Sequence, residues 1–282
     1  MAGRPPETRT ALGPMTIAAA EQYTPAERRI VHDDLAARFI PAGLRAAIRV
    51  PAVRRLLVAA TERQATGIWG SMLCRKRYAD DRVAEAVREG PEQLLVLGAG
   101  LDTRAYRLAG DLPVVEVDLP ANIADKRARV EAVFGRVPPN VTLLPVDFET
   151  DDLAALLDLD RPTMIVWEAV TQYLTENGFR KTFALLSKAA PGGRLIFTYV
   201  LADFLDGSHS YGAERAYHEY VIKHRIWRFG LLPGEVAPLL REYGWTETEQ
   251  VGPEEYRARY LANRPGLAVS EAERFVHAVK EA

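Results

Sequence analysis

The feature that most constrains this fold is an apolar strand that runs into a glycine turn, followed by a second strand that ends in an acid. Residues 94–97 are an unbroken apolar run, typical of a strand buried on both faces of a parallel sheet. Gly98 and Gly100 then allow a sharp turn and close approach to a ligand. Asp118 follows the next strand, about 20 positions after Gly98, where doubly wound sheets bind ribose hydroxyls. The segment therefore predicts a nucleoside-binding site.

The turn itself favours one nucleoside ligand over another. A dinucleotide-binding turn carries a third glycine and presents a free helix N-terminus to pyrophosphate. Here Thr103 occupies the third position, and Asp102 places in the loop a carboxylate that would repel a pyrophosphate. The same carboxylate is compatible with S-adenosylmethionine, whose amine and sulfonium are cationic. The turn is therefore better suited to a cationic ligand such as S-adenosylmethionine than to a pyrophosphate, although a glycine pair also occurs in purely structural turns.

Composition excludes several other classes of protein. The chain has 282 residues, a net charge of −2 and 48% hydrophobic residues, which are ordinary values for a large α/β domain. No basic stripe predicts nucleic-acid binding, and no apolar run approaches the length of a membrane span. The single cysteine, Cys74, excludes an internal disulfide and a thiolate metal cluster. We expect a cytoplasmic protein that contacts neither nucleic acid nor membrane and holds no metal.

Hydrophobic patterning predicts a helical N-terminal part followed by alternating strands and helices. Helices are expected near 25–40, 42–66 and 78–89, with breaks at Pro41, Pro51 and Gly70. Strands are expected at 94–97, 114–117, 141–146, 164–167, 194–200, 245–251 and 275–279. The intervening helices are expected near 103–109, 120–134, 150–157, 176–190 and 253–262. This order is typical of an α/β fold, a parallel sheet covered by helices on both faces.

The chain is expected to form one domain, 15–282, preceded by a flexible arm at 1–14 that is rich in glycine, proline and charge. The predicted parts of the domain are a helical N-terminal part, a cofactor-binding core, an aromatic-rich cap or substrate region and the closing strands, at 15–90, 91–200, 201–243 and 244–282. The cap would lie over the carboxyl ends of the strands, where ligands bind. Most of its aromatic residues are equally well explained as packing between the cap and the sheet.

Acids follow three of the predicted strands. Asp118, Asp147 and Glu168 each lie at the carboxyl end of a different strand, and in an open parallel sheet those ends line one crevice. The first is placed for a ribose and the second for an adenine amine, with Phe148 beside the purine. Each acid alone is also a plausible helix cap. Three carboxylates in one crevice are costly unless they meet donors or a cation, which favours a sulfonium ligand.

Five motifs resemble the leucine carboxyl methyltransferase family of S-adenosylmethionine-dependent enzymes, and in particular its bacterial O-methyltransferase branch. The motifs are RKRYADD at 75–81, LGAGLDTRAYRL at 97–108, EVDLP at 116–120, PVDFE at 145–149 and WEAVTQYL at 167–174. The resemblance covers residues 75–200. It implies a class I methyltransferase fold, Rossmann-like, whose seven-stranded and mostly parallel sheet ends in an antiparallel strand.

The resemblance also implies which residues hold the cofactor. An arginine of the first motif grips the cofactor carboxylate, with Arg75 preferred to Arg77 by its spacing. Asp118 holds the ribose, and Glu168 faces the methionine part. The other predicted cofactor contacts lie in the glycine turn, around the adenine and beside the acids: Gly98, Ala99, Gly100, Asp102, Leu119, Asp147, Phe148 and Ala169. Bacterial members often carry glycine where this chain has Ala169.

The methyl acceptor is predicted to be a carboxylate on a small molecule or peptide. A carboxylate is ionised at neutral pH, so it needs orientation by hydroxyl donors or a cation rather than a base. The hydroxyl candidates are Tyr173, Tyr199 and Tyr211, and the candidate clamps are Arg215 and Arg28. We expect these residues at the mouth of the crevice.

The alternative acceptor is a hydroxyl on a secondary metabolite. Such an acceptor would need a general base, and His209 and His218 are the candidates. Arg104 and Arg107 are expected to be structural and to bridge Asp102 and the preceding helix. Two other classes stay open, an NAD(P)-dependent oxidoreductase and a non-catalytic binding module. The missing third glycine counts against the first. A homodimer is also left open.

Overall fold

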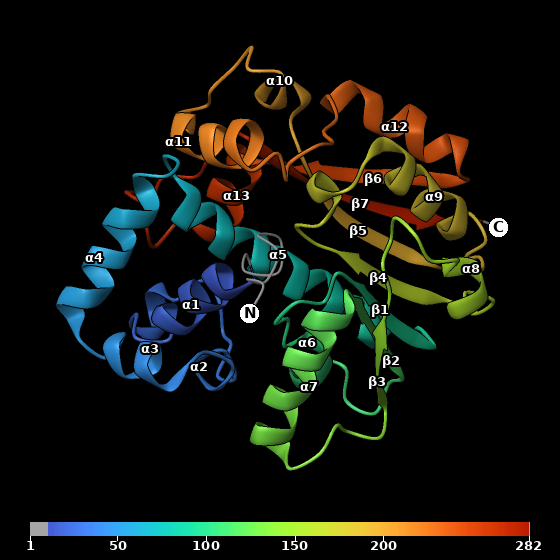
Figure 1. Cartoon of the computed structure of the whole chain (residues 1–282), viewed down its shortest axis with the longest axis horizontal. Coiled ribbons are helices and arrows are strands. Elements are labelled where there is room, and N and C mark those ends of the chain that lie inside the picture. The colour runs from blue at the N-terminus through green and yellow to red at the C-terminus, as the bar shows by residue number, and fades with distance from the viewer. Residues whose placement is uncertain (1–10, 282) are drawn as a thin grey trace.

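The computed structural model describes residues 11–281, and its centre is a seven-stranded sheet (Figure 1). The strands lie in the order β3-β2-β1-β4-β5-β7-β6. Their bounds are β1 Gln93–Leu97, β2 Val114–Asp118, β3 Val141–Pro145, β4 Thr163–Trp167, β5 Arg194–Val200, β6 Trp245–Val251 and β7 Glu273–Lys280. Strands β1 to β5 run parallel, whereas β7 is antiparallel to both β5 and β6. The predicted mostly parallel sheet with an antiparallel last strand is confirmed.

Helices precede the sheet and connect its strands. The N-terminal helices are α1 (Leu12–Glu21), η2 (Ala26–Arg28), α2 (Ala36–Phe39), α3 (Ala42–Ala47), α4 (Pro51–Glu62) and α5 (Ile68–Glu89). The later helices are α6 (Arg104–Arg107), α7 (Pro120–Phe134), α8 (Leu153–Leu156), η3 (Thr171–Tyr173), α9 (Glu176–Leu186), α10 (Ala202–Leu205), α11 (Glu214–Ala216), η4 (Tyr217–Lys223), α12 (Pro233–Glu242) and α13 (Pro253–Tyr260). Within residues 11–281, no helix is both long enough and apolar enough to cross a membrane.

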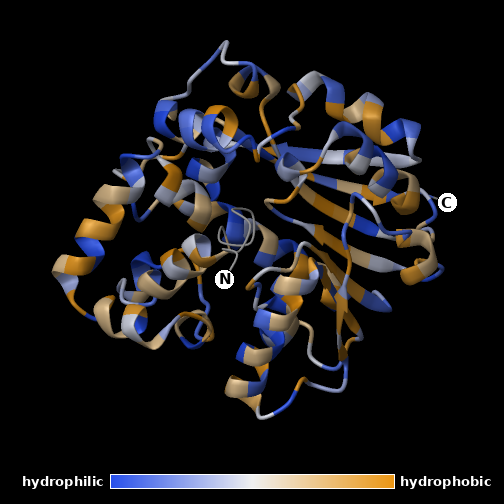
Figure 2. Cartoon of the chain, viewed as in Figure 1, coloured by the Kyte–Doolittle hydropathy of each residue, from blue (hydrophilic) through white to orange (hydrophobic). Residues whose placement is uncertain are grey.

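The sheet is buried on both faces, as the apolar run of β1 predicts. Leu94 and Val96 pack in one hydrophobic cluster with residues of α5, α7 and α13. Leu95 and Leu97 point the other way, into a second cluster with residues of α9 and α12. Hydrophobic residues accordingly concentrate on the central strands (Figure 2). Because side chains alternate along a strand, an unbroken apolar run is what two covered faces require.

The connection order places a crevice at the centre of the sheet. The chain passes from β1 to β2 and β3 on one side, then returns to β4 and β5 on the other side of β1. The connections therefore diverge above the carboxyl ends of β1 and β4. Ligands of open α/β sheets bind at such a switch point.

The N-terminal part departs from the predicted helices in two places. A helix over 25–40 is wrong, because residues 29–33 are not helical; there the Glu21 side chain accepts a hydrogen bond from the backbone N–H of Ile30 at 2.9 Å. The break at Gly70 is also wrong, since α5 runs through it. A Cβ at this position would lie 2.1 Å from the carbonyl oxygen of Ala268, so the glycine serves close packing rather than a turn.

Other N-terminal predictions hold. Pro41 precedes α3, and Pro51 is the first residue of α4, where a missing N–H costs nothing. Of the predicted flexible arm, residues 1–10 lie outside the described residues, and 12–14 form the first turn of α1.

The segment between β5 and β6 forms a cap of α10, α11, η4 and α12. Its η4 is a π-helix that continues directly from α11. Its middle is tied back to the sheet, because the backbone N–H of Leu231 donates to the carbonyl of Val200 at 3.1 Å. π-Helical turns are rare and concentrate at functional sites.

Candidate functional site

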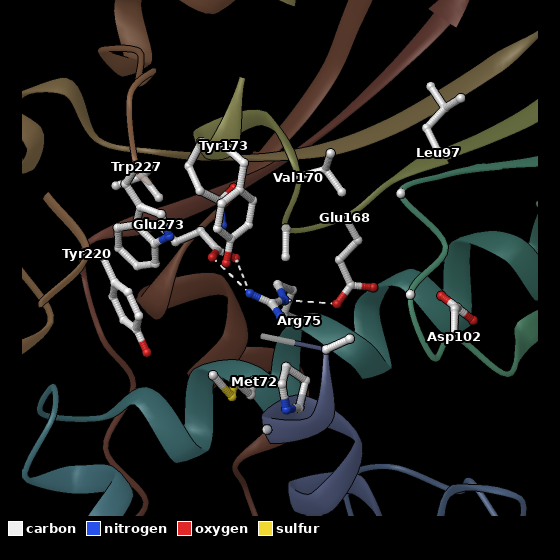
Figure 3. A pocket seen from close by; sticks show the side chains of 18 of the residues that line it. Met72, Arg75, Leu97, Asp102, Glu168, Val170, Tyr173, Tyr220, Trp227 and Glu273 are labelled. Atoms are coloured by element: carbon white, nitrogen blue, oxygen red, sulfur yellow. Dashed lines mark hydrogen bonds and ion pairs between the residues drawn. The ribbon is translucent and has the colours of Figure 1, made fainter. Parts of the chain in front are cut away.

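A cavity of about 480 Å³ lies at the carboxyl ends of the parallel strands. Its lining comes from α1, α5, the turn after β1, the ends of β2 to β5, and the cap. In Figure 3, Arg75 lies between two differently built regions. We call the first the charged arm, which contains Gly98–Asp102, Asp118, Asp147, Arg104 and Glu168. We call the second the aromatic arm, which contains Met72, Tyr173, Phe204, Tyr220 and Trp227.

The glycine turn forms the floor of the charged arm. Gly98 has φ +69°, and a Cβ there would lie 2.2 Å from Cγ2 of Val170. Gly100 has φ +42°. The turn is fixed beneath by Lys126, which is fully buried, donates to the carbonyl of Ala99 at 3.2 Å and pairs with Glu116. The predicted turn residues therefore line the cavity in a conformation that requires glycine.

Asp118 is held directly against this turn. Its Oδ2 accepts a hydrogen bond from the backbone N–H of Gly100 at 2.6 Å. Its Oδ1 accepts from the backbone N–H of Leu119 and from Nδ2 of Asn122, both at 2.7 Å. Both carboxylate oxygens are thus oriented by donors, and the side chain is pre-organised at the end of β2.

The end of β3 contributes the next wall. Asp147, Phe148 and Glu149 all line the cavity. Oδ1 of Asp147 accepts from the backbone N–H of Glu149 at 2.9 Å, which closes a tight local turn. Phe148 is buried and belongs to the hydrophobic cluster on the α9 side of the sheet. The ring is therefore firmly packed.

Glu168, after β4, is at the centre of an ion-pair network. Its Oε1 contacts Nε of Arg75 at 2.9 Å, and its Oε2 contacts Nη2 of Arg104 at 2.8 Å (Figure 3 shows the first contact). Burial alone would raise the pKa of Glu168, but Arg104 and Arg75 hold that pKa below its ordinary value. This carboxylate is ionised and compensated by resident cations.

Arg104 links the glycine turn to α5. It pairs with Asp102, with Asp80 at 2.7 Å and with Glu168, and its side chain is only 1% exposed. Burial alone would raise the pKa of Asp102, but Arg104 lowers it strongly. Arg107 extends the network by pairing with Asp80 at 2.9 Å. The two arginines therefore bridge the turn and α5, as predicted.

Ala169 lies in the left-handed region with φ +59°, a conformation that ordinarily favours glycine. Its backbone N–H donates to Oγ1 of Thr198 at 2.7 Å, which holds the residue there. The departure from glycine noted in the sequence is thus a site of backbone strain.

The structure separates the two candidate arginines. Arg75 lines the cavity and pairs with Glu168 and Glu273. Arg77 instead pairs with Asp81 at 2.8 Å and donates to the carbonyl of Ile30. Among the residues described, only the first of the two faces the cavity.

Rings from three elements form the aromatic arm. Trp227 stacks on Tyr220 with 4.9 Å between ring centroids and approaches Phe204 at 6.1 Å. Tyr173 comes from η3, and Met72 lies on α5 (Figure 3). Arg228 lies beside these rings with its side chain 43% exposed, and its Nε donates to the carbonyl of Tyr173 at 2.9 Å. This arm offers flat apolar surfaces with one guanidinium beside them.

Several residues predicted at the mouth of the crevice are elsewhere. Tyr199 is fully buried, and its hydroxyl donates to Oε1 of Gln250 at 2.6 Å. Tyr211 donates to Oδ2 of Asp203 at 2.6 Å, and the exposed His209 contacts the same oxygen at 3.2 Å. None of these three lines the cavity within the described chain. The reason is the local fold of the cap: residues 209 and 210 lie on an exposed loop, and the partly buried Tyr211 packs against the hydrophobic cluster on the α9 side of the sheet.

The two candidate arginine clamps and the second candidate base also lie away from the cavity. The exposed residues Arg28, Arg215 and His218 are absent from the cavity lining that the structure describes. Of the predicted acceptor-side residues, Tyr173 alone lines the cavity. Every predicted cofactor residue does line it.

Other lining residues were missed by sequence analysis. They are polar or aromatic side chains that reach the cavity from five elements and from the loop after η4: Lys76, Asn122, Gln172, Tyr220, Trp227, Arg228 and Glu273. Asn122 had a detectable signal, because it lies in the first turn of α7, only four positions after Asp118. Glu273 and Arg228 had none, since their contacts to Arg75 and Tyr173 are distant in the chain.

Comparison with known proteins identifies the family. The family model for leucine carboxyl methyltransferase matches residues 11–187. A protein of Mycolicibacterium paratuberculosis is 34% identical over 137 residues, 46% of this chain and 51% of its own length. One of Mycobacterium marinum is 31% identical over 209 residues, 68% and 64% of the respective lengths. Both bear the name "putative S-adenosyl-L-methionine-dependent methyltransferase". The chain spans about half the length of the first relative.

The fold comparison agrees with the family match. The chain superimposes with a TM-score of 0.60 on the crystal structure of a protein from Thermobifida fusca YX that is named a "putative methyltransferase". The two sequences are 16% identical, and the match covers 100% of both chains. This likeness concerns the fold alone, and it bears out the class I methyltransferase fold. The chain belongs to the leucine carboxyl methyltransferase family.

Proposed function

We propose that this protein is an S-adenosylmethionine-dependent methyltransferase that transfers a methyl group to the oxygen of a carboxylate on a small molecule or peptide. The family match and the names of its relatives support the reaction class. The observation that carries the proposal is the division of one cavity into a charged arm and an aromatic arm on either side of Arg75.

The charged arm fits the cofactor. Asp118 is oriented by backbone donors and would accept the ribose hydroxyls, while Phe148 and Asp147 would flank the adenine. Arg75 would bind the carboxylate of the methionine part. Asp118 and Asp147 have no salt-bridge partner among the described residues. Because no resident cation within residues 11–281 pairs with these two acids, they favour a cationic ligand over a pyrophosphate.

The aromatic arm fits the acceptor. S-adenosylmethionine supplies a methyl group activated on a sulfonium, so the residues of this chain mainly align the acceptor oxygen and exclude water. Trp227 and Tyr220 would enclose the acceptor, and Arg228 would hold its carboxylate by a charge-assisted hydrogen bond. The acceptor oxygen forms a bond to the methyl carbon as the carbon–sulfur bond breaks, and the electron pair stays on sulfur.

A carboxylate is preferred to a hydroxyl because of what lines the cavity. No histidine lines the cavity in residues 11–281, so neither histidine considered as a base is in position. An ionised carboxylate needs no base. A guanidinium beside the aromatic arm is the group that such an acceptor requires.

We further propose that residues 15–282 act as one domain in which 201–243 is the substrate region. The cap supplies Phe204, Tyr220 and Trp227 to the cavity. Cys74 is free and buried, which fits a reducing, cytoplasmic setting.

Two measurements test the proposal. Calorimetry with S-adenosylhomocysteine and with NADH separates methyltransferase from oxidoreductase: we expect micromolar binding of the first and none of the second. Incubation with methyl-labelled cofactor and cell extract separates an enzyme from a binding module. A methyl ester releases labelled methanol in alkali, whereas a methyl ether does not. Label that is transferred but resists alkali would exclude the carboxylate acceptor.

A further inference from the structure

Glu273 joins the cavity from the last strand of the chain. It is the first residue of β7 and pairs in register with Val200 at the carboxyl end of β5. It lies outside the segment matched by the family model, which ends at residue 187. Its side chain nevertheless lines the cavity beside Arg75 (Figure 3).

The contact between these two side chains occupies a specific part of the guanidinium. Both carboxylate oxygens of Glu273 contact Nη1 of Arg75, at 3.1 and 2.9 Å, while Glu168 takes Nε at 2.9 Å. A guanidinium binds carboxylates through pairs of its N–H groups, so an occupied Nη1 limits how a second carboxylate can bind. Any ligand carboxylate that approaches this arginine meets one already there.

The two glutamates are not held equally. Glu168 forms salt bridges with two arginines, because Arg104 contacts its second carboxylate oxygen at 2.8 Å in addition to the contact with Arg75. Glu273 has Arg75 as its salt-bridge partner and no other cation in range within residues 11–281. Burial and the neighbouring Glu168 charge raise the pKa of Glu273, although Arg75 opposes this shift. Of the two carboxylates on Arg75, Glu273 is the one that another carboxylate can displace at lower cost.

We propose that Glu273 competes with the carboxylate of the cofactor for Arg75 and thereby weakens binding of the cofactor's amino-acid end. This inference rests on the proposed function, since it requires that Arg75 receives that carboxylate. Glu273 acts through Arg75 and is a positioning residue. Its effect is confined to ligands that carry the amino-acid end.

The test is Glu273→Gln, which keeps the shape of the side chain and removes its charge. We expect S-adenosylhomocysteine to bind about tenfold more tightly by calorimetry, the scale of about 1.4 kcal/mol. 5′-Methylthioadenosine lacks both the carboxylate and the amine, and its affinity should not change. The matched control is Glu271→Gln, an exposed glutamate two positions earlier, which should alter neither affinity.

The outcomes separate this inference from the proposed function. Unchanged or weaker S-adenosylhomocysteine binding in a folded Glu273→Gln variant overturns the inference, and weaker binding would assign Glu273 to the amine. Absence of binding to the unmodified protein overturns the proposed function itself. If Glu273→Gln does not fold, Glu273→Asp shortens the side chain by one methylene and should give a smaller gain in affinity. A loss of affinity for both ligands would mean a merely structural role and would also contradict the inference.

Discussion

The charged arm of the cavity is an alternation of carboxylates and guanidinium groups, whereas the aromatic arm is a set of stacked rings. In the first, Glu168, Arg104 and Asp102 lie within one buried ion-pair network. In the second, Trp227 and Tyr220 come from a cap whose π-helix is half-buried. The difference fits the proposed division of the cavity into a cofactor site and an acceptor site.

The largest expected effect is on stability, in the charged arm. Arg104→Ala leaves Asp102, Asp80 and Glu168 without a shared buried cation, which should lower the free energy of unfolding by about 3–5 kcal/mol. Urea denaturation measures this. Arg161→Ala removes an exposed ion pair with Asp158 and should give no measurable change. Equal effects of the two variants would show that the buried network is not what holds this arm.

The next effect is on cofactor affinity. Asp118→Ala removes the acceptor for the backbone N–H of Gly100 and the predicted ribose contact, and it should weaken S-adenosylhomocysteine binding by about 1–3 kcal/mol. Calorimetry measures the change, and a thermal melt checks that the variant is folded. Unchanged affinity would remove Asp118 from the cofactor site.

The aromatic arm should respond in the opposite pattern. Trp227→Ala removes a ring that lines the proposed acceptor site, and about 2 kcal/mol of lost acceptor binding would correspond to roughly a 30-fold fall in kcat/KM. S-adenosylhomocysteine affinity should stay within about twofold, because the two arms share few contacts. Phe229→Ala, two positions on and outside the cavity lining, is the control for loss of a ring. A parallel loss of cofactor affinity would show that the arms are not separate.

The smallest effect concerns backbone strain. Ala169→Gly relieves the strain of a φ of +59°, but glycine also increases the conformational entropy of the unfolded chain. The net effect should be a rise of about 0.5 kcal/mol in the free energy of unfolding. Ala155→Gly, in the right-handed helix α8, should instead lower it. Urea denaturation of both variants gives the comparison. A loss of stability in Ala169→Gly would mean that the alanine methyl group contributes more by packing than its backbone conformation costs.

The charged arm could be predicted from the sequence because its determinants are local. Strands β1, β2 and β4 are short and largely apolar; Asp118 is the last residue of β2, and Glu168 directly follows β4. A residue at a strand end needs only the strand to be placed. Gly70 shows the limit, since its role depends on Ala268, nearly two hundred positions away.

Apart from Tyr173, the residues of the aromatic arm could not be predicted from the sequence. Tyr211 and His209 were as plausible as Tyr220 and Trp227, because the cap has no periodic pattern that assigns side chains to a face. A π-helix adds a residue to the turn and shifts which positions point inward. The predicted position of Tyr199 was wrong for another reason: side chains alternate along β5, and this alternation directs Tyr199 to the α12 side of the sheet.

The most direct test of the account is a crystal structure with S-adenosylhomocysteine bound. We expect the adenosine between Asp118 and Phe148, the carboxylate at Arg75, and the sulfur facing the space beside Tyr173 and Trp227. A nucleoside lodged among the aromatic rings, or bound away from the glycine turn, would contradict the assignment of the two arms.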